Sequence, residues 1–378
     1  MEKLNQTATE RRRITRNRLY RYLYDAPQGH SKQEMADDLG LSMPTVHQNL
    51  AELLQAELVR ANGVRGSTGG RRVTQIAVAE NARFALGISV SGDHFRILAA
   101  NLRLEEIAYR RSDHPRTESL AELGRLLAAE IEHFLTDFGL NREKLLGVGI
   151  ALPAILNADR TRLLTAPTLH LHDADLQPLA SAIPYPVQVD NDATSGGYAE
   201  WFAQKEKSSM AYLSLEGGVG GAVLLNGTPY TGANGRSGEF GHICVQPGGL
   251  PCQCGQQGCL EAYCSSARIS TDLGITVEQF FTGLAAGNLA YRTLWADYLQ
   301  HLSVGLATIR MTLDCNIVLG GYLAQYLPPY LPELRRLTAG HDPFDKGGAH
   351  YVRLCHYPKH AVSLGVALHF ITQFIEAL

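Results

Sequence analysis

The sequence contains no apolar run approaching the roughly 18 to 20 residues that a helix needs to cross a bilayer. Its first residues, MEKLNQTATERRRITRNR, lack the apolar core of a secretory signal peptide. It also lacks a long linker, a low-complexity tract and a repeat at a fixed period, which excludes a solenoid. These absences favour a cytoplasmic globular protein.

The composition is that of an ordinary soluble protein, with 378 residues, 45% hydrophobic and 19% charged, enough for two or three domains. The net charge of −3 conceals an asymmetry. Residues 1–75 carry 12 Lys and Arg against 8 Asp and Glu, whereas the remainder carries 22 against 29. A basic segment on an acidic body favours a polyanion-binding module, although a solvated charged face has the same pattern.

The first 80 residues predict the order helix, turn, helix, helix and hairpin. Residues 1–15 are polar, so we expect them to be loosely ordered, and helical apolar spacing runs over residues 14–24. The capping box at residues 31–34 opens a second helix, which ends at Gly40.

A third helix is predicted after Ser42, with Pro44 in its first turn. Four residues form its expected apolar stripe: Val46, Leu50, Leu53 and Leu54. Short strands are predicted at residues 58–59 and 73–78, joined by a turn rich in Gly and Arg, NGVRGSTGGRR. This order is typical of a winged helix-turn-helix.

The candidate DNA contacts lie at the start of the third helix, which meets base edges, and in the basic turn, which reaches phosphates or the minor groove. They are Ser42, Thr45, His47, Gln48, Arg65, Arg71 and Arg72. The alternative for this segment is a three-helix structural or dimerisation module.

After about residue 80 the pattern predicts strands that alternate with helices. Apolar runs indicate strands at residues 84–90, 95–100, 146–152 and 187–189. Residues 119–138 form an amphipathic helical pattern. This alternation indicates an α/β body.

The strongest chemical signal is a set of one histidine and three cysteines in the segment 242–259. Its members are His242, Cys252, Cys254 and Cys259. One imidazole and three thiolates make a closed tetrahedral zinc site, and three thiolates favour zinc over magnesium or calcium. With no evident open position, the metal is expected to be structural. The alternative is a group of buried cysteines beside a surface histidine.

This segment resembles the signature of the ROK family, which comprises repressors, open reading frames and sugar kinases. The shared pattern is Glu-x-Gly-His followed by Cys-x-Cys-Gly-x-x-Gly-Cys-x-Glu. VDNDATSGGYAE, LNGTPYTGANGRSGEFGH, IVLGGYL and LGVAL resemble further family segments, and the turn TGGRR is typical of the repressor branch. The resemblance covers essentially the whole chain.

The resemblance implies an actin-like, two-lobed sugar-kinase-like fold of the ATPase type behind a winged helix-turn-helix. The expected domains are residues 1–80 for the DNA-binding head, residues 81–190 with the C-terminal helix 362–378 for the first lobe, and residues 191–361 for the second lobe with the zinc site.

By motif, the resemblance also implies a sugar site. Its expected contacts are Asn191, Asp192, Glu239, His242 and Glu261. Sugar hydroxyls can donate to carboxylates and accept from Asn or His. One ring nitrogen of His242 would bind the metal while the other faces the sugar, so zinc would fix the group from behind. Asp192 matches the family's catalytic base.

The two phosphate-handling loops of the kinases are altered here. The segment SVSGD, from Ser89 to Asp93, stands where the kinases have a loop that resembles Asp-x-Gly-Gly-Thr. The segment from Glu216 to Gly221 stands where they have Gly-Thr-Gly-x-Gly. A carboxylate about 4 Å from a phosphate repels it by roughly 4 kcal/mol at an effective dielectric near 20. We therefore expect no ATP, no catalytic residue, and Asp192 only as a vestigial base. Pro153-Ala154 departs from the family's Pro-Gly, which leaves the identity of the sugar open.

The sequence thus predicts a repressor-like regulator whose degenerate sugar-kinase-like sensor binds a monosaccharide or sugar derivative. A homodimer or higher homo-oligomer would bind a near-palindromic operator in double-stranded DNA. Whether sugar releases or promotes DNA binding stays open. Two alternatives remain: an active ATP-dependent sugar kinase with a DNA-binding head, and a regulator whose sugar cleft is vestigial and whose signal is a protein partner.

Overall fold

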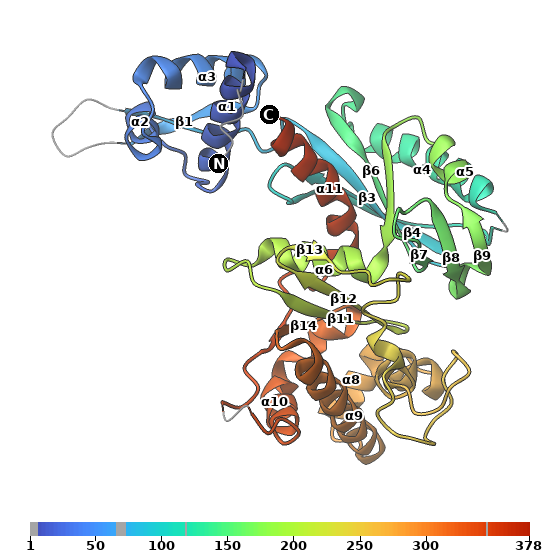
Figure 1. The fold of residues 1–378 in the computed structure, drawn as a ribbon. Coiled ribbons are helices and arrows are strands. Elements are labelled where there is room, and N and C mark those ends of the chain that lie inside the picture. Colours follow the sequence, from blue (N-terminus) through green and yellow to red (C-terminus); the bar gives the residue numbers. More distant parts are fainter. Residues whose placement is uncertain (1–6, 66–72, 118, 345–346) are drawn as a thin grey trace.

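The computed structural model describes residues 7–65, 73–117, 119–344 and 347–378, and for Ala8, Val64 and Arg65 only the backbone. Figure 1 shows an N-terminal head, two β-sheets with their helices, and the C-terminal helix between them. In the part of the chain that the structure describes, no helix is both long and apolar enough for a membrane span.

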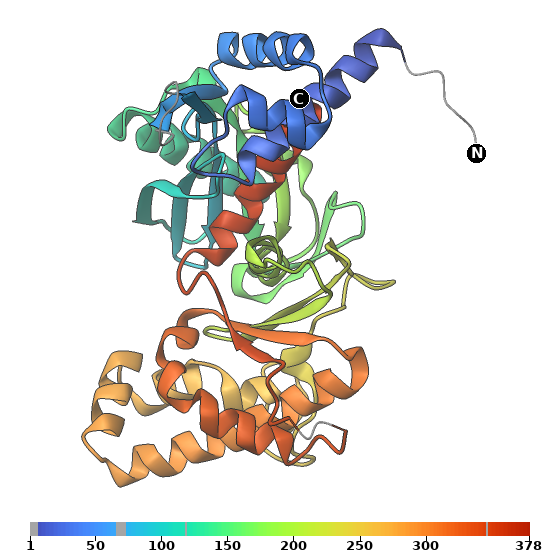
Figure 2. The same cartoon turned by 90° about the vertical axis from the view of Figure 1, so that its left-hand side faces the viewer.

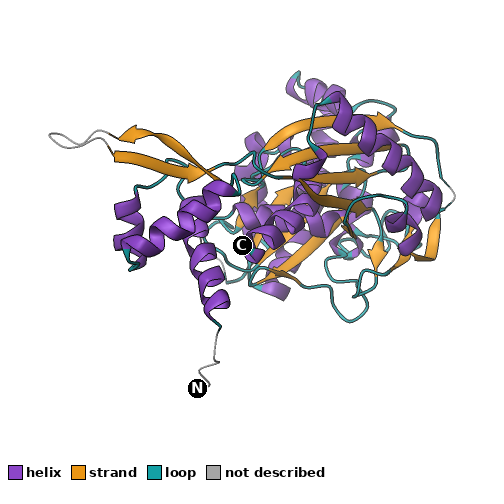
Figure 3. Cartoon of the chain, turned by 90° about the horizontal axis from the view of Figure 1, so that it is seen from above, coloured by secondary structure: helices purple, strands orange, loops and turns teal. Residues whose placement is uncertain are grey.

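The head contains three helices and one antiparallel hairpin, in the order the sequence predicts. They are α1 (Ala8–Tyr24), α2 (Lys32–Leu39), α3 (Met43–Gln55), β1 (Val59–Arg65) and β2 (Val73–Val78). Ser31 and Glu34 form the capping box of α2, and Gly40 ends that helix in the left-handed conformation. Figure 3 shows the hairpin extending away from the body.

Two details of the head differ from the prediction. Helix α1 begins at Ala8, so the expectation of loose order is wrong for residues 8–15, because Thr7 caps the helix by accepting from the Glu10 N–H at 3.2 Å. Leu54 is 44% exposed, although it was expected in the apolar stripe. It lies roughly a quarter turn from the centre of the buried face, and Asn49 is buried there instead.

The first sheet has the order β10-β6-β3-β4-β5, with β10, β6 and β3 parallel to one another and β4 antiparallel to both β3 and β5. Its strands are β3 (Phe84–Val90), β4 (His94–Asn101), β5 (Glu106–Asp113), β6 (Leu145–Leu152) and β10 (Val187–Asn191). Side chains alternate between the faces, so one face packs on α4 (Leu120–Asp137) and α5 (Gln177–Ser181) and the other on α11 (Ala361–Ala377). The four predicted strands and the predicted helix are all present.

A small antiparallel sheet follows the first one in the chain. It contains β7 (Ile155–Leu156), β8 (Arg162–Ala166) and β9 (Leu171–Asp175). These strands are not predicted from the sequence, because strands this short show little alternation of apolar and polar residues.

The second sheet has the order β13-β12-β11-β14-β15. Its strands are β11 (Met210–Leu215), β12 (Val219–Leu225), β13 (Thr228–Pro229), β14 (Asn316–Gly320) and β15 (Val352–Leu354). One face packs on α6 (Asp192–Ala203), and the other on the helices α7 (Leu260–Cys264), α8 (Val277–Ala285), α9 (Leu289–Leu313) and α10 (Leu331–Ala339). Each sheet thus has its own covering helices.

Helix α11 lies against the first sheet, against α6 and against the head (Figure 2). Glycines allow the close approach: a Cβ at Gly87 of β3 would lie 1.7 Å from the Ser363 carbonyl oxygen, and one at Gly149 of β6 would lie 2.3 Å from that of Val366. Where α11 crosses α6, a Cβ at Gly365 would lie 1.8 Å from the Ser195 carbonyl oxygen. Backbone therefore packs directly on backbone.

The head is attached to the C-terminal end of α11. Arg16 donates to the Leu378 carbonyl oxygen at 2.9 and 2.6 Å, and Asn17 donates to the Ile375 carbonyl. Apolar side chains of α1 belong to the same buried cluster as those of α11. A displacement of α11 would therefore be transmitted to the head.

We expect Gly365→Ala to lower the free energy of unfolding by about 1–3 kcal/mol, because the new methyl group meets a backbone carbonyl that cannot move alone. Helix propensity acts in the opposite direction, since Ala is favoured over Gly by about 1 kcal/mol. Urea unfolding followed by circular dichroism measures the change. Gly305→Ala in α9 is the matched control, because its Cβ would meet only the methyl groups of Leu260. Equal stability of both variants would contradict the packing argument.

Candidate metal centre and polar cavity

The predicted metal ligands are brought together in space. One ligand atom from each of His242, Cys252, Cys254 and Cys259 lies within 4.8 Å of the others. The Cys254 and Cys259 sulfurs are 3.7 Å apart, and His242 Nδ1 is 3.8 Å from the Cys252 sulfur. Two thiolates on a tetrahedral zinc at about 2.3 Å lie about 3.8 Å apart, so the donor set fits this ion.

Local backbone geometry forms this cluster. Cys252 N–H donates to the Gln256 carbonyl at 2.8 Å, and Gly258 N–H donates to the Leu250 carbonyl at 2.8 Å. Gly258 has φ +82°, and a Cβ there would lie 1.9 Å from the Gln246 carbonyl oxygen, so this turn requires glycine. These hydrogen-bonded turns of residues 250–258 place Cys259 directly before α7.

The electrostatics of the cluster favour a cation. Burial, reinforced by the neighbouring thiols, raises the pKa of Cys259 to about 12, and burial also raises the pKa of Cys252. The pKa of Cys254 is lowered instead, chiefly by a hydrogen bond from the Gln256 N–H, so the protonated thiol is favoured at Cys252 and Cys259. A divalent ion reverses this preference, because ligating thiols are deprotonated.

A polar cavity of about 420 Å³ lies beside the cluster. The five predicted sugar contacts all line it: Asn191, Asp192, Glu239, His242 and Glu261. The Nδ1 atom of His242 faces the cysteines, while its Nε2 atom lies 3.8 Å from a Glu239 carboxylate oxygen. The imidazole thus lies between the three cysteines and the cavity.

Asn191 and Asp192 lie where β10 passes into α6. The Asn191 side chain caps α6 by accepting from Thr194 N–H at 2.8 Å, and its amide donates to the Ala154 carbonyl at 3.0 Å. Asp192 accepts from Ala193 N–H at 2.8 Å. Burial, with the nearby charge of Glu239, raises the pKa of Asp192 to about 6.

Glu261 is positioned by the loop of residues 216–221, which stands where the kinases have a phosphate loop. One of its carboxylate oxygens accepts from Val219 N–H at 2.9 Å. A Cβ at Gly218 would lie 2.7 Å from that oxygen, so the glycine lets the acid reach the backbone. Glu261 therefore joins α7 to the second sheet at the cavity wall.

The two carboxylates of the altered loops have different positions. Glu216 lines the cavity and accepts from Tyr322 N–H at 3.0 Å, and burial raises its pKa. Asp93 is exposed, and its carboxylate lies 2.7 Å from His94 Nδ1. Asp93 is not among the residues that line this cavity. Of the two carboxylates in the altered loops, Glu216 is therefore the one that adds an acidic group to the cavity wall.

Several further polar side chains line the cavity that are not predicted from the sequence. Thr165, Thr168 and Ser214 also line it, and their hydroxyls have no sequence signal that marks them as ligands. Behind it, the buried Asp190 carboxylate accepts from Arg160 at 3.0 Å and lies 3.2 Å from His369 Nε2 of α11. This contact joins residues far apart in the chain, so no local pattern reveals it.

The structure places four of the predicted DNA contacts at the start of α3. Ser42 caps the helix and shares a 2.8 Å hydrogen bond with Thr45. His47 and Gln48 are exposed, and His47 Nδ1 lies 3.3 Å from Lys32 Nζ of α2. Arg71 and Arg72 lie outside the described residues, and Arg65 is placed only by its backbone at the end of β1.

We expect Cys254→Ser to reduce zinc binding and to lower the free energy of unfolding by on the order of 4 kcal/mol, because a structural metal contributes folding energy. Elemental analysis of the purified chain and thermal unfolding, with and without a chelator, measure both effects. Cys244→Ser is the matched control, since Cys244 lies in the same segment but outside the cluster. A Cys254→Ser variant with full zinc content and unchanged stability would contradict the metal assignment.

Comparison with known proteins adds a family and a fold. The chain is 26% identical over 362 residues to the xylose repressor of Bacillus subtilis (strain 168), covering 92% of each protein. A crystal structure of a ROK family transcriptional regulator, a homolog of the Escherichia coli MLC protein, superposes with TM-score 0.76, 20% identity and 97% of both chains.

A ROK family glucokinase from Streptomyces griseus, solved with glucose and AMPPNP, has TM-score 0.63 and 21% identity over 76% of this chain and 98% of its own. The predicted α/β sugar-kinase-like fold is thereby confirmed. The ROK family profile matches residues 85–367, well over half of the sequence. The chain belongs to the ROK family.

Proposed function

We propose that this protein is a sugar-responsive DNA-binding transcription regulator, a repressor, with a sensor that has lost phosphoryl transfer. The observation that carries the proposal is the combination in one chain of a head with an exposed third helix and a cavity on which the predicted sugar contacts converge. Similarity to a xylose repressor over 92% of the chain supports it.

The head, residues 1–80, acts in this proposal as a winged helix-turn-helix. Helix α3 enters the major groove and presents Thr45, His47 and Gln48 to base edges, while Ser42 fixes the start of that helix. The arginines of the hairpin turn, Arg65, Arg71 and Arg72, contact phosphates or the minor groove. Two heads of a homodimer or higher homo-oligomer read the two halves of a near-palindromic operator.

The sensor comprises two lobes, residues 81–190 with 362–378 and residues 191–361. Its cavity, about 420 Å³, is of a size that accommodates a monosaccharide or a derivative. Carboxylates of Asp192, Glu239 and Glu261 accept from sugar hydroxyls, and Asn191 and His242 complete the set. A zinc ion on the opposite side of His242 holds the imidazole in its orientation.

Glu216 is the reason to assign no kinase activity. Its carboxylate lines the sugar cavity, in the loop that stands where the kinases have Gly-Thr-Gly-x-Gly. A charged carboxylate about 4 Å from a phosphate oxygen costs roughly 4 kcal/mol at an effective dielectric near 20. Asp192 is then retained as a sugar ligand, and no ATP is required.

Sugar acts on DNA binding only if it binds one arrangement of the lobes more tightly than the other. Helix α11 is one element through which the sensor reaches the head, because Arg16 and Asn17 of α1 bond to its last turn. For a repressor, the expected direction is release of the operator when sugar binds.

The test begins with operators selected from randomised duplex DNA by the full-length chain. Fluorescence anisotropy then measures operator affinity against pentoses, hexoses, amino sugars and polyols. We expect one sugar class to weaken operator binding, and Asp192→Asn to require at least about tenfold more of it, because a charge-assisted hydrogen bond is lost. Glu143→Gln, which removes an exposed carboxylate far from the cavity, should respond as the wild type does.

Failure of every sugar to change operator affinity would refute the sensor, and failure to select any DNA would refute the reader. The alternative function, an active sugar kinase, is examined with the same preparation. A coupled assay of ADP release with MgATP and the responding sugar is expected to show no turnover above background. Turnover at an ordinary kinase rate would overturn the assignment of a degenerate sensor.

Sugar affinity is also expected to depend on pH through Asp192, whose pKa burial raises to about 6. The carboxylate accepts charge-assisted hydrogen bonds from hydroxyls, whereas the protonated form is a weaker acceptor, so affinity should be full well above pH 6 and fall by up to about tenfold per pH unit below it. Calorimetric titration between pH 5 and 8 measures this. Asp192→Asn should bind weakly and lose this step, and an unchanged step in that variant would assign it to another group.

A further inference from the structure

The chain passes between its two large sheets before α6 and again before α11. Strand β10 of the first sheet leads into α6, which packs on the second sheet. Strand β15 of the second sheet leads, through residues 355–360, into α11, which packs on the first sheet. The two helices cross at backbone contact, where a Cβ at Gly365 would lie 1.8 Å from the Ser195 carbonyl oxygen. A change in the angle between the sheets therefore turns about this crossing.

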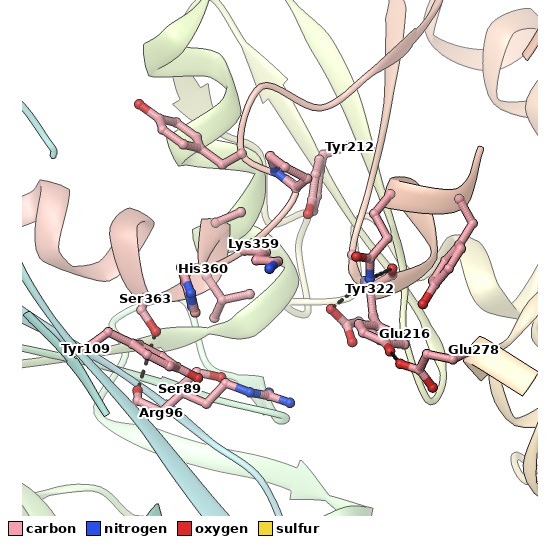
Figure 4. A pocket seen from close by; sticks show the side chains of 17 residues that line it. Ser89, Arg96, Tyr109, Tyr212, Glu216, Glu278, Tyr322, Lys359, His360 and Ser363 are labelled. Carbon is pink, nitrogen blue, oxygen red and sulfur yellow. Dashed lines mark hydrogen bonds between the residues drawn. The ribbon is translucent and has the colours of Figure 1, made fainter. Parts of the chain in front are cut away.

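Two cavities lie between the sheets beside the crossing. The sugar cavity is one of them, and a cavity of about 390 Å³ is the other. Figure 4 shows Arg96 of the first sheet and Glu216, which follows β11 of the second, on opposite sides of this further cavity. Lys359 and residues 360–363 also line it, and Glu216 lines both cavities. Side chains of the two sheets face each other across these spaces, so a small change in the angle meets little steric resistance there.

His369 of α11 lies about one turn beyond Gly365 and contacts an element on each side of the crossing. Its Nε2 atom is 3.2 Å from a carboxylate oxygen of Asp190 in β10. Its ring stacks on Tyr198 of α6, with the ring centroids 5.0 Å apart and the planes at 17°. Because a carboxylate oxygen only accepts, the Nε2 atom is the donor. A turn of α6 relative to β10 therefore changes at least one of these two contacts.

Asp190 links this contact to the sugar cavity. The residue is 3% exposed, and its carboxylate accepts from Asn191 N–H at 2.8 Å and forms an ion pair with Arg160 at 3.0 Å. Asn191 is a predicted sugar contact, and Arg160 lies in the β7–β8 turn. The two strands beside this turn supply Ile155 and Thr165 to the cavity wall. A buried carboxylate is costly without its partners, so a movement of either wall segment is passed on to Asp190.

His369 also lies between the part of α11 that is fixed to the first sheet and the part that bonds to the head. The backbone of α11 packs on glycines of that sheet at residues 363–366, whereas residues 375–378 accept hydrogen bonds from α1. The C-terminal end of α1 has a second attachment, where the Tyr24 hydroxyl donates to the Leu102 carbonyl at 2.7 Å. A displacement that reaches α11 through His369 is therefore expected to tilt α1 about this second attachment.

We propose that His369 couples the sugar cavity to the head. Sugar binding changes the angle between the sheets, His369 follows Asp190 and Tyr198, and the end of α11 moves the head. The inference rests on the proposed function and names the route by which its sugar signal travels. His369 is a positioning residue, since it is not among the described residues that line the sugar cavity. A side chain that only stabilises the fold would not selectively change the coupling between sugar and operator.

The coupling is measured on the full-length, zinc-loaded chain as the ratio of the operator Kd with saturating sugar to the operator Kd without it, by fluorescence anisotropy. The probes are D-glucose, D-xylose, N-acetyl-D-glucosamine and sorbitol, one from each class of the operator assay. Calorimetry gives the sugar Kd of the DNA-free chain. We expect His369→Ala to keep the sugar Kd and the sugar-free operator Kd within about threefold and to lower the ratio by about fivefold or more. His369→Gln, which keeps a side-chain N–H for Asp190, should recover part of the ratio.

His301→Ala is the matched control. The His301 side chain is 13% exposed, stacks on Tyr263 with centroids 3.8 Å apart, and has its Nδ1 atom 3.3 Å from an Asp297 carboxylate oxygen. It thus resembles His369 in its surroundings but belongs to α9, which packs on α7, α8 and α10. Its loss should leave the ratio unchanged, even where thermal unfolding shows lower stability.

The proposal is overturned if His369→Ala keeps the wild-type ratio, or if His301→Ala loses the ratio to the same extent. It is also overturned if His369→Ala loses sugar binding itself, because the residue would then act on the cavity and not on the coupling. A wild type that none of the probes releases from the operator refutes the proposed function, and the coupling with it. Failure of the coupling alone leaves the wild-type response intact, so the two failures are distinguishable.

Discussion

The direct packing of α11 on backbone is the constraint on which the rest of the structure depends. Gly87 and Gly149 leave two positions of the first sheet without a side chain beneath this helix, and Gly365 lets it cross α6 at backbone contact. Packing this close transmits displacement well, because there is no flexible side chain to absorb it. Helix α11 thus contacts both sheets' elements and the head, and direct contacts such as the hydrogen bond from Tyr24 to the Leu102 carbonyl also join the head to the first sheet.

The functional regions lie along that helix. Its first turn borders the cavity that contains Arg96, its middle contacts Asp190 through His369, and its last turn accepts hydrogen bonds from the head. Asp190 immediately precedes the predicted sugar contacts Asn191 and Asp192. A ligand that shifts the start of α6 therefore acts on an element that already touches the head.

Patterns among neighbouring residues in the sequence predict much of this structure. Contacts between segments that lie far apart in the chain leave no such pattern. One short segment contains Cys252, Cys254 and Cys259, so their spacing alone predicts the candidate metal cluster. The strands of the first sheet are long enough to show their apolar runs, whereas β7 to β9 are too short. Arg96 and Lys359 come from distant segments and share a wall only after folding, so neither carries a signal in the sequence.

In the proposed function, Glu216 is the residue that separates sugar binding from phosphoryl transfer. The residue borders both cavities, and its carboxylate is held in place by Tyr322 N–H. A phosphoryl group passing from one side to the other would have to approach this acid, at a cost of roughly 4 kcal/mol for a charged pair about 4 Å apart at an effective dielectric near 20. Sugar binding in its own cavity needs no such approach. Under the proposed function, the carboxylate that disfavours transfer therefore leaves the sugar contacts in place.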